Sequence, residues 1–173
     1  SETNIGNRPH DYETFKQQAE LLRDSGVDLI VIETMTEIKE LKAAVLAVKD
    51  VYSGPVITQM TFTNEGTSVT GTDVLSFIAM AESLDVDAIG MNCSVGPKDL
   101  LKLAKFMAEN TNLPISFKPN AGMPQFINRK TIFPGTPEEF TEVCLKAYDY
   151  GINMLGGCCG TDPQYIKMLS EKL

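Results

Sequence analysis

The sequence has little of what several common functional classes require. Only one of its 173 residues is histidine, so a serine-type catalytic triad or a histidine-rich metal site is a poor interpretation. No apolar run approaches the roughly 20 residues that a membrane-spanning helix needs. Lysine and arginine number 15 against 23 acidic residues, and the net charge of -8 argues against nucleic acid or a membrane surface as a partner.

An export signal is also missing from the start of the sequence. The segment SETNIGNRPHDYE has no basic region followed by an apolar core, so it does not resemble a signal peptide. We therefore expect a cytoplasmic protein in a reducing compartment. In such a compartment four cysteines predict metal binding or catalysis before they predict disulfides.

Hydrophobic periodicity and turn residues divide the chain into alternating helices and strands. Continuous apolar runs predict buried strands, and amphipathic segments predict helices. Gly26 is expected to follow the end of the first helix, and Thr72 or Asp73 to cap the third. The expected strands are 27–34, 54–62, 86–94, 113–122 and 152–159, and the expected helices are 11–25, 36–52, 70–84, 97–111, 136–151 and 161–173.

This alternation predicts an α/β fold with a parallel sheet, either an open doubly wound sheet or part of a (βα)8 barrel. No G-x-G-x-x-G follows a strand, so the dinucleotide-binding version lacks support. Polar clusters follow all five strands, and a barrel concentrates its chemistry on that face. A complete barrel takes about 250 residues. We therefore expect residues 1–173 to form barrel strands 4–8, the C-terminal five βα units, with the N-terminal three strands absent.

Three cysteines stand at the ends of expected strands. Cys93 ends one strand, and the pair Cys158–Cys159 ends another that should lie two positions away in a barrel. Three thiolates that converge on one point suit zinc, with a fourth position left open as in catalytic sites. The preceding glycines, Gly156 and Gly157, tolerate the irregular backbone needed to turn both sulfurs inward. The fourth cysteine, Cys144, lies on the apolar face of a helix, and we interpret it as a core residue.

The motifs GMNCSVGP, KPNAG and GGCCGTDP make the chain similar to the zinc-dependent homocysteine S-methyltransferases. The similarity runs from the helix at residue 11 to the end of the chain. NCSVGP and KPNAGMP resemble the homocysteine module of cobalamin-dependent methionine synthase more than the betaine-dependent enzymes. The resemblance implies a zinc ion on Cys93, Cys158 and Cys159, homocysteine as the methyl acceptor and methionine as the product. It also implies methylcobalamin as the methyl donor on a separate domain, with a methyltetrahydrofolate domain as a further partner.

The amino-acid end of homocysteine needs contacts of its own. Glu33 is the first polar residue after a buried run and is expected to accept hydrogen bonds from the substrate ammonium group. Ser94 and the residues that follow it can offer backbone N–H groups to the substrate carboxylate at a helix N-terminus. Asn120 either lines the pocket or orients a loop. Asn92 is expected to point away from the metal, in a structural or an outer-shell hydrogen bond.

The family's first strand carries an acidic residue that helps to hold the substrate amine, and the chain has no counterpart to it. We therefore expect the chain alone to be weakly active at best, and its open sheet edges to favour self-association. Two alternatives stay open: a non-catalytic zinc-binding or thiol-storage module, and a redox module that forms a disulfide between Cys158 and Cys159. A barrel enzyme with a phosphate substrate ranks last, because no phosphate-binding loop follows the last strands. The methyl donor, for which S-methylmethionine and betaine are alternatives, and the exact thiol acceptor also stay open.

Overall fold

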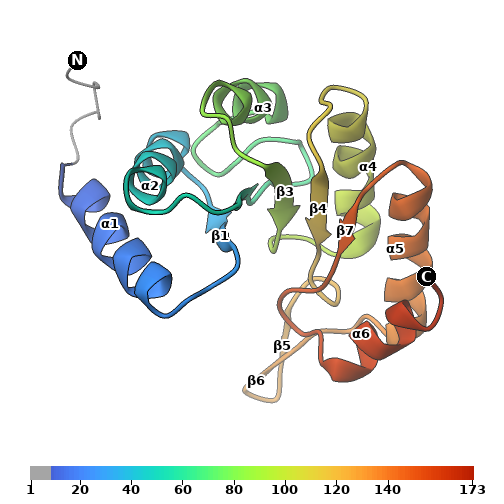
Figure 1. The fold of residues 1–173 in the computed structure, drawn as a ribbon. Helices are drawn as coiled ribbons and strands as arrows, with labels where there is room; N and C mark the ends of the chain where they lie inside the picture. The colour runs from blue at the N-terminus through green and yellow to red at the C-terminus, as the bar shows by residue number, and fades with distance from the viewer. Residues whose placement is uncertain (1–8) are drawn as a thin grey trace.

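The computed structural model describes residues 9–173 and confirms the alternation of strands and helices. Figure 1 shows the helices as an arc around one side of the strands. The first helix, α1 (Pro9–Asp24), precedes five units in which a strand is followed by a helix. These units are β1 (Ile30–Met35) with α2 (Ile38–Val51), β2 (Val56–Met60) with α3 (Val74–Ser83), β3 (Ala88–Asn92) with α4 (Pro97–Ala108), β4 (Ile115–Lys118) with α5 (Pro137–Asp149), and β7 (Met154–Leu155) with α6 (Pro163–Ser170).

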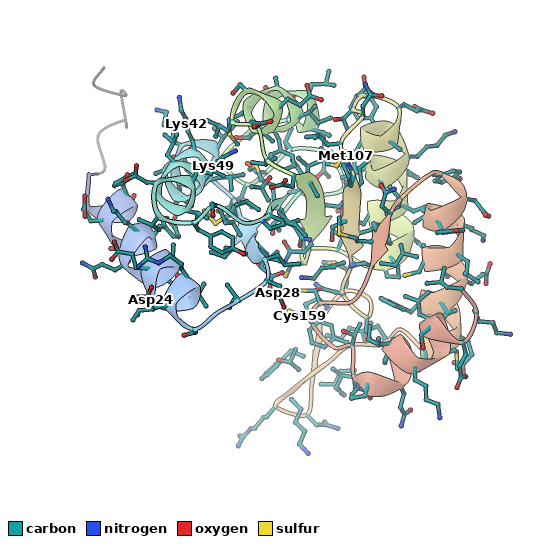
Figure 2. The ribbon with its side chains drawn as sticks, in the orientation of Figure 1. Asp24, Asp28, Lys42, Lys49, Met107 and Cys159 are labelled. Atoms are coloured by element: carbon teal, nitrogen blue, oxygen red, sulfur yellow. The ribbon has the colours of Figure 1, made fainter. Side chains whose placement is uncertain are left out.

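The five strands form one parallel sheet in the order β1-β2-β3-β4-β7. Every strand therefore presents its carboxyl end at the same edge of the sheet. The strands β3 and β7 lie on either side of β4, as the predicted spacing of the two cysteine segments requires. Cys159 lies beyond that edge, whereas Met107 lies toward the opposite end of the strands (Figure 2).

The two faces of the sheet differ in chemistry. Residues at alternate strand positions point toward the helices and form a continuous buried core with them; the sheet members are Ile30, Ile32, Val56, Met60, Ile89, Met91, Ile115 and Phe117. The intervening positions form the opposite face, here called the inner face, and its polar members are Glu33, Gln59, Asn92, Ser116 and Lys118. Period-2 alternation separates these sets, since successive strand side chains point to opposite sides. The apolar face secures the fold, and the inner face is left for polar groups.

Local signals set the ends of several helices. Gly26 has φ 77°, which is a conformation that glycine adopts without strain after a helix, as predicted. Asp73 caps α3, because its carboxylate accepts a hydrogen bond from the Ser76 N–H at 2.8 Å. None of the helices within residues 9–173 has both the length and the apolar character needed to cross a membrane.

A short hairpin was not predicted from the sequence. The strands β5 (Gln125–Ile127) and β6 (Lys130–Ile132) pair antiparallel between β4 and α5 and project from the carboxyl edge of the sheet (Figure 1). Asn128 and Arg129 form its turn, both with positive φ. All residues of both strands are exposed, so the sequence lacks the alternation of buried apolar and exposed polar residues that would predict a strand here.

Candidate metal centre

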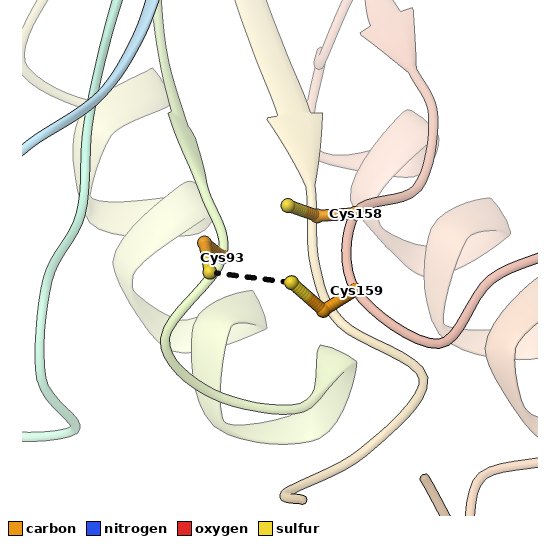
Figure 3. A group of neighbouring side chains, drawn as sticks. All are labelled: Cys93, Cys158 and Cys159. Carbon is orange, nitrogen blue, oxygen red and sulfur yellow. Dashed lines mark hydrogen bonds between the residues drawn. The ribbon is translucent and has the colours of Figure 1, made fainter. Parts of the chain in front are cut away.

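Three cysteine side chains converge at the carboxyl edge of the sheet. Cys93 directly follows β3, and Cys158 and Cys159 follow β7 on the other side of β4. Their sulfur atoms all lie within 4.8 Å of one another, and the sulfurs of Cys93 and Cys159 are 3.8 Å apart (Figure 3). Two ligands of a tetrahedral Zn²⁺ with Zn–S bonds of about 2.3 Å are separated by about 3.8 Å. The donor set and its spacing therefore fit a zinc ion with three sulfur ligands.

The backbone at Cys93 leaves the strand by an unusual turn. Cys93 and Ser94 both have φ 63°, a left-handed conformation that residues other than glycine rarely adopt. The Cys93 N–H still donates to the carbonyl of Lys118 at 3.1 Å, which continues the pairing of β3 with β4. The Val95 N–H then donates to the Cys93 carbonyl at 2.9 Å. Backbone strain of this kind collects at functional sites, where the surrounding structure must hold it.

The segment with the doubled cysteine is bonded along the continuation of β4. The Cys158 N–H donates to the carbonyl of Pro119 at 2.9 Å, and the Ala121 N–H donates to the carbonyl of Cys159 at 2.8 Å. The glycine before the pair has a spatial reason, since a Cβ on Gly157 would lie 2.7 Å from the Cβ of Thr161. Gly157 has no positive φ, so close packing rather than a left-handed backbone requires glycine at that position.

The prediction that Asn92 points away from the metal ligands is wrong. Asn92 is fully buried, and its Nδ2 lies 3.7 Å from the sulfur of Cys158 and donates to the Thr34 hydroxyl at 2.7 Å. Its Oδ1 accepts a hydrogen bond from the Thr34 N–H at 2.8 Å. As the last residue of β3, Asn92 aligns with Lys118, so it belongs to the inner face and reaches the site from there. Its amide donor can stabilise a thiolate at Cys158.

Two of the cysteines, Cys159 and Cys144, have a pKa raised above that of an isolated thiol. The pKa of Cys159 is raised to about 11. The main cause is partial burial of its sulfur, followed by a hydrogen bond with the thiol of Cys93 and the proximity of Cys158. Without a cation this thiol is protonated at neutral pH, and a metal ion would have to displace the proton. Cys144 lies in the core on α5, as predicted, and burial raises its pKa to about 12.

Glu33 lies on the inner face by the regular alternation of β1, and an irregularity in the strand follows it. The register shifts between Ile32 and Met35, and Thr34 has φ 62°, which is the geometry of a bulge that re-aims side chains. Glu33 forms an ion pair with Lys118, a residue that was not predicted to belong to the site. Thr34, its neighbour, bonds to Asn92 and so joins Glu33 to the cysteine cluster.

The remaining predicted substrate residues lie beside the cysteines. Asn120 is buried, and its Oδ1 accepts a hydrogen bond from the Cys159 N–H at 3.0 Å, so it orients the loop that carries two of the sulfurs. Ser94 lies between Cys93 and the start of α4. The N-cap residue of that helix is Gly96, so no side chain of the N-cap residue caps the first N–H groups of α4. Substrate contacts by Glu33, Ser94 and Asn120 stay predictions.

Two methionine synthases are related to the chain along most of its length. The chain is 30% identical over 161 residues to "Methionine synthase" of Mycobacterium leprae, which covers 90% of this chain and 13% of that protein. It is 32% identical over 150 residues to "Methionine synthase" of Mycobacterium tuberculosis, which covers 83% of this chain and 13% of that protein. The chain thus spans about 13% of the length of these relatives.

Crystal structures of the homocysteine methyltransferase MmuM from Escherichia coli share the fold. The metallated form matches with a TM-score of 0.78 and 21% identity, over 99% of this chain and 56% of that chain. The apo form matches with a TM-score of 0.77 and 22% identity, over 94% of this chain and 58% of that chain. These likenesses confirm the predicted α/β fold, in which the five parallel βα units form part of a (βα)8 barrel.

The family comparison agrees with the motifs around the cysteines. Residues 8–173 match the family described as Homocysteine S-methyltransferase, which is nearly the whole chain. The match covers the segments that carry the sulfur cluster at the carboxyl edge of the parallel sheet. The chain therefore belongs to the homocysteine S-methyltransferase family.

Proposed function

We propose that residues 1–173 form part of the homocysteine-binding barrel domain of a methyltransferase that makes methionine. The observation that carries the proposal is the convergence of three cysteine sulfurs within 4.8 Å in a chain of this family. The relatives are methionine synthases of which the chain spans 13%, and this share leaves room for other domains. We place the donor, methylcobalamin, and a methyltetrahydrofolate site on such separate domains.

Cys93, Cys158 and Cys159 would hold the zinc ion, since their sulfurs all lie within 4.8 Å of one another and one pair is 3.8 Å apart. Zinc bound there would keep the sulfur of homocysteine as a thiolate at neutral pH. Asn92 would donate its amide hydrogen to Cys158, and Asn120 would fix the loop through the Cys159 N–H. These two amides would hold the cysteines in place for the ion, and zinc on three protein ligands would have a further position to offer the substrate thiol.

The reaction needs one bond formed and one bond broken. The thiol of homocysteine gives up its proton, and its sulfur attacks the methyl carbon of the donor to form a new S–C bond. The bond between the donor and the methyl group breaks, and the donor keeps the electron pair. Glu33 would hold the substrate ammonium group, and the N–H groups that follow Ser94 would face the carboxylate.

The first experiment measures metal content and then thiol binding. Chain purified under reducing conditions should bind about one zinc per chain, and Cys159→Ser should lose it, whereas the core variant Cys144→Ala should keep it. With Co²⁺ in place of zinc, L-homocysteine should add a thiolate–metal absorption band. Failure of the reduced chain to take up added zinc would overturn the proposal.

A second candidate is a redox thiol module. In place of the expected Cys158–Cys159 pair it would use Cys93 and Cys159, whose sulfurs are 3.8 Å apart. Two thiols this close need only a small movement to reach the S–S bond length of about 2.05 Å. This candidate predicts a reversible two-electron couple and metal release on oxidation, with no response of the metal to added homocysteine. The Co²⁺ titration therefore separates the two functions.

A further inference from the structure

The inner face of the sheet carries a second feature, an ion pair of which the proposed chemistry uses only the carboxylate partner. Among the residues of the five described strands of this sheet, Glu33 and Lys118 are the ionisable groups, and they form an ion pair. The pair joins β1 to β4 across the two strands between them, and the partners are 85 residues apart in the sequence.

Lys118 adjoins both segments that carry the clustered cysteines. Its carbonyl accepts the Cys93 N–H at 3.1 Å. Its side chain lies along Gly156, where an added Cβ would be 3.3 Å from the Lys118 Cγ, two residues before Cys158. The side chain of Lys118 is 27% exposed, whereas that of Lys146, which pairs with Glu142 on the surface of α5, is 53% exposed. The cation is therefore partly buried and paired with Glu33, on a residue whose carbonyl and Cγ adjoin the segments that carry the clustered cysteines.

The charges of the pair match those of an α-amino acid. An amino acid carries one ammonium and one carboxylate, so it can insert between Glu33 and Lys118 and give each of them an opposite charge. A thiol with only one of these charges leaves one partner unmatched in a partly desolvated site, which costs free energy. The net charge of -8 adds to this argument, because the protein as a whole repels a carboxylate and needs a local cation to attract one.

We propose that Lys118 is a specificity-determining residue that binds the carboxylate of the thiol substrate, after the substrate ammonium has taken its place on Glu33. This inference rests on the proposed function, since it needs a thiol at the cysteine cluster. It assigns to Lys118 a role that the motif KPNAG alone does not indicate.

The test compares three thiols on the Co²⁺-loaded chain by the thiolate–metal absorption band. The thiols are L-homocysteine, 3-aminopropane-1-thiol, which lacks the carboxylate, and 4-sulfanylbutanoic acid, which lacks the ammonium. Lys118→Met should weaken homocysteine binding by roughly tenfold or more, because a charge-assisted hydrogen bond is lost. Binding of 3-aminopropane-1-thiol should not weaken. Lys118→Arg should keep most of the affinity for homocysteine, and the surface control Lys146→Met should change nothing.

The outcomes separate this inference from the function on which it rests. If Lys118→Met weakens the binding of homocysteine and of 3-aminopropane-1-thiol equally, or of neither, Lys118 does not bind the carboxylate. The inference is then overturned, while the proposed function stands. If no thiol changes the spectrum of the wild-type chain, both are overturned. Glu33→Gln gives the mirror result, a loss of affinity for the two thiols with an ammonium group and none for 4-sulfanylbutanoic acid.

Discussion

Cys144 and the cluster of Cys93, Cys158 and Cys159 place the same side chain in two opposite settings. Cys144 lies within a regular helix, is fully buried and packs with apolar neighbours. The clustered cysteines lie in irregular segments just beyond strand ends and are partly or largely exposed. Burial gives the helix cysteine a raised pKa with no ligand partner, whereas convergence gives the others a shared position for a cation.

The comparison teaches that the element, and not the residue type, decides what a cysteine does here. A helix directs Cys144 into the core because its periodicity repeats with the apolar face. A parallel sheet brings strand ends together from distant parts of the sequence, so cysteines placed there meet. The four experiments below change one side of this comparison at a time.

The largest expected effect is the loss of the metal. Cys158→Ser should reduce zinc from about one per chain to nearly none at micromolar metal, because two thiolates do not complete the site. Elemental analysis after dialysis measures it, with Cys144→Ala as the matched cysteine control. Equal zinc loss in both variants would erase the distinction between the cluster and the core cysteine.

The next effect concerns the amide that contacts the cluster. Asn92→Ala should weaken zinc binding by roughly 10- to 100-fold, the usual effect of removing a partner that hydrogen-bonds a metal ligand. Competition with a chromophoric chelator measures the affinity. Asn110→Ala is the control, since Asn110 bonds to the Phe106 carbonyl at the end of α4, outside the cluster. Unchanged zinc affinity in Asn92→Ala would show that Asn92 only connects β3 to β1 through its hydrogen bonds with Thr34.

A smaller effect is expected in the core. Cys144→Ala should lower the free energy of unfolding by about 1–2 kcal/mol, because it removes a buried sulfur and leaves a small void. Urea unfolding of the zinc-free protein measures the change. Zinc stoichiometry in the folded variant should equal that of the wild type, and a loss of zinc there would show that the core and the site are coupled.

The smallest effect is a difference in pH dependence. Burial raises the pKa of Cys144 to about 12, so the folded chain keeps this proton at a pH where the unfolded chain, with a cysteine pKa of about 8.5, has lost it. The contribution of the Cys144 thiol to the free energy of unfolding is fully present below about pH 8.5, and it decreases as the pH rises toward 12. Between these limits the zinc-free wild type should lose stability faster than Cys144→Ala. Parallel curves would show that the thiol does not ionise on unfolding.

Much of the fold followed from local patterns in the sequence. Apolar runs and amphipathic segments placed all five strands of the sheet and all six helices of the described chain, with ends that differ by a few residues. The last strand shows the limit of this approach. A strand over 152–159 was expected, but β7 is Met154–Leu155, although Gly156 and Cys158 still donate to the carbonyls of Phe117 and Pro119 beyond the assigned strand. The hairpin turn at Asn128–Arg129 lacks the Asn-Gly pair that usually signals such a turn.

The cysteine cluster could be predicted because cysteines are rare and stood at strand ends, where a parallel sheet collects them. The amide contact of Asn92 and the ion pair of Glu33 with Lys118 could not. Both depend on strand register and on the bulge at Thr34, which decide which face a side chain joins. A shift of one residue would turn each of them to the other face.

Local patterns in the sequence were enough to predict the order of strands and helices, the apolar face of the sheet and the edge at which the cysteines meet. Hydrophobic periodicity acts over a few residues, so it can be recognised without knowing the fold. The sulfur separations, the side on which Asn92 lies and the partner of Lys118 depend on how the folded chain packs. Such contacts join residues that are far apart in the chain, and their geometry is set by register, backbone strain and packing that no local pattern contains.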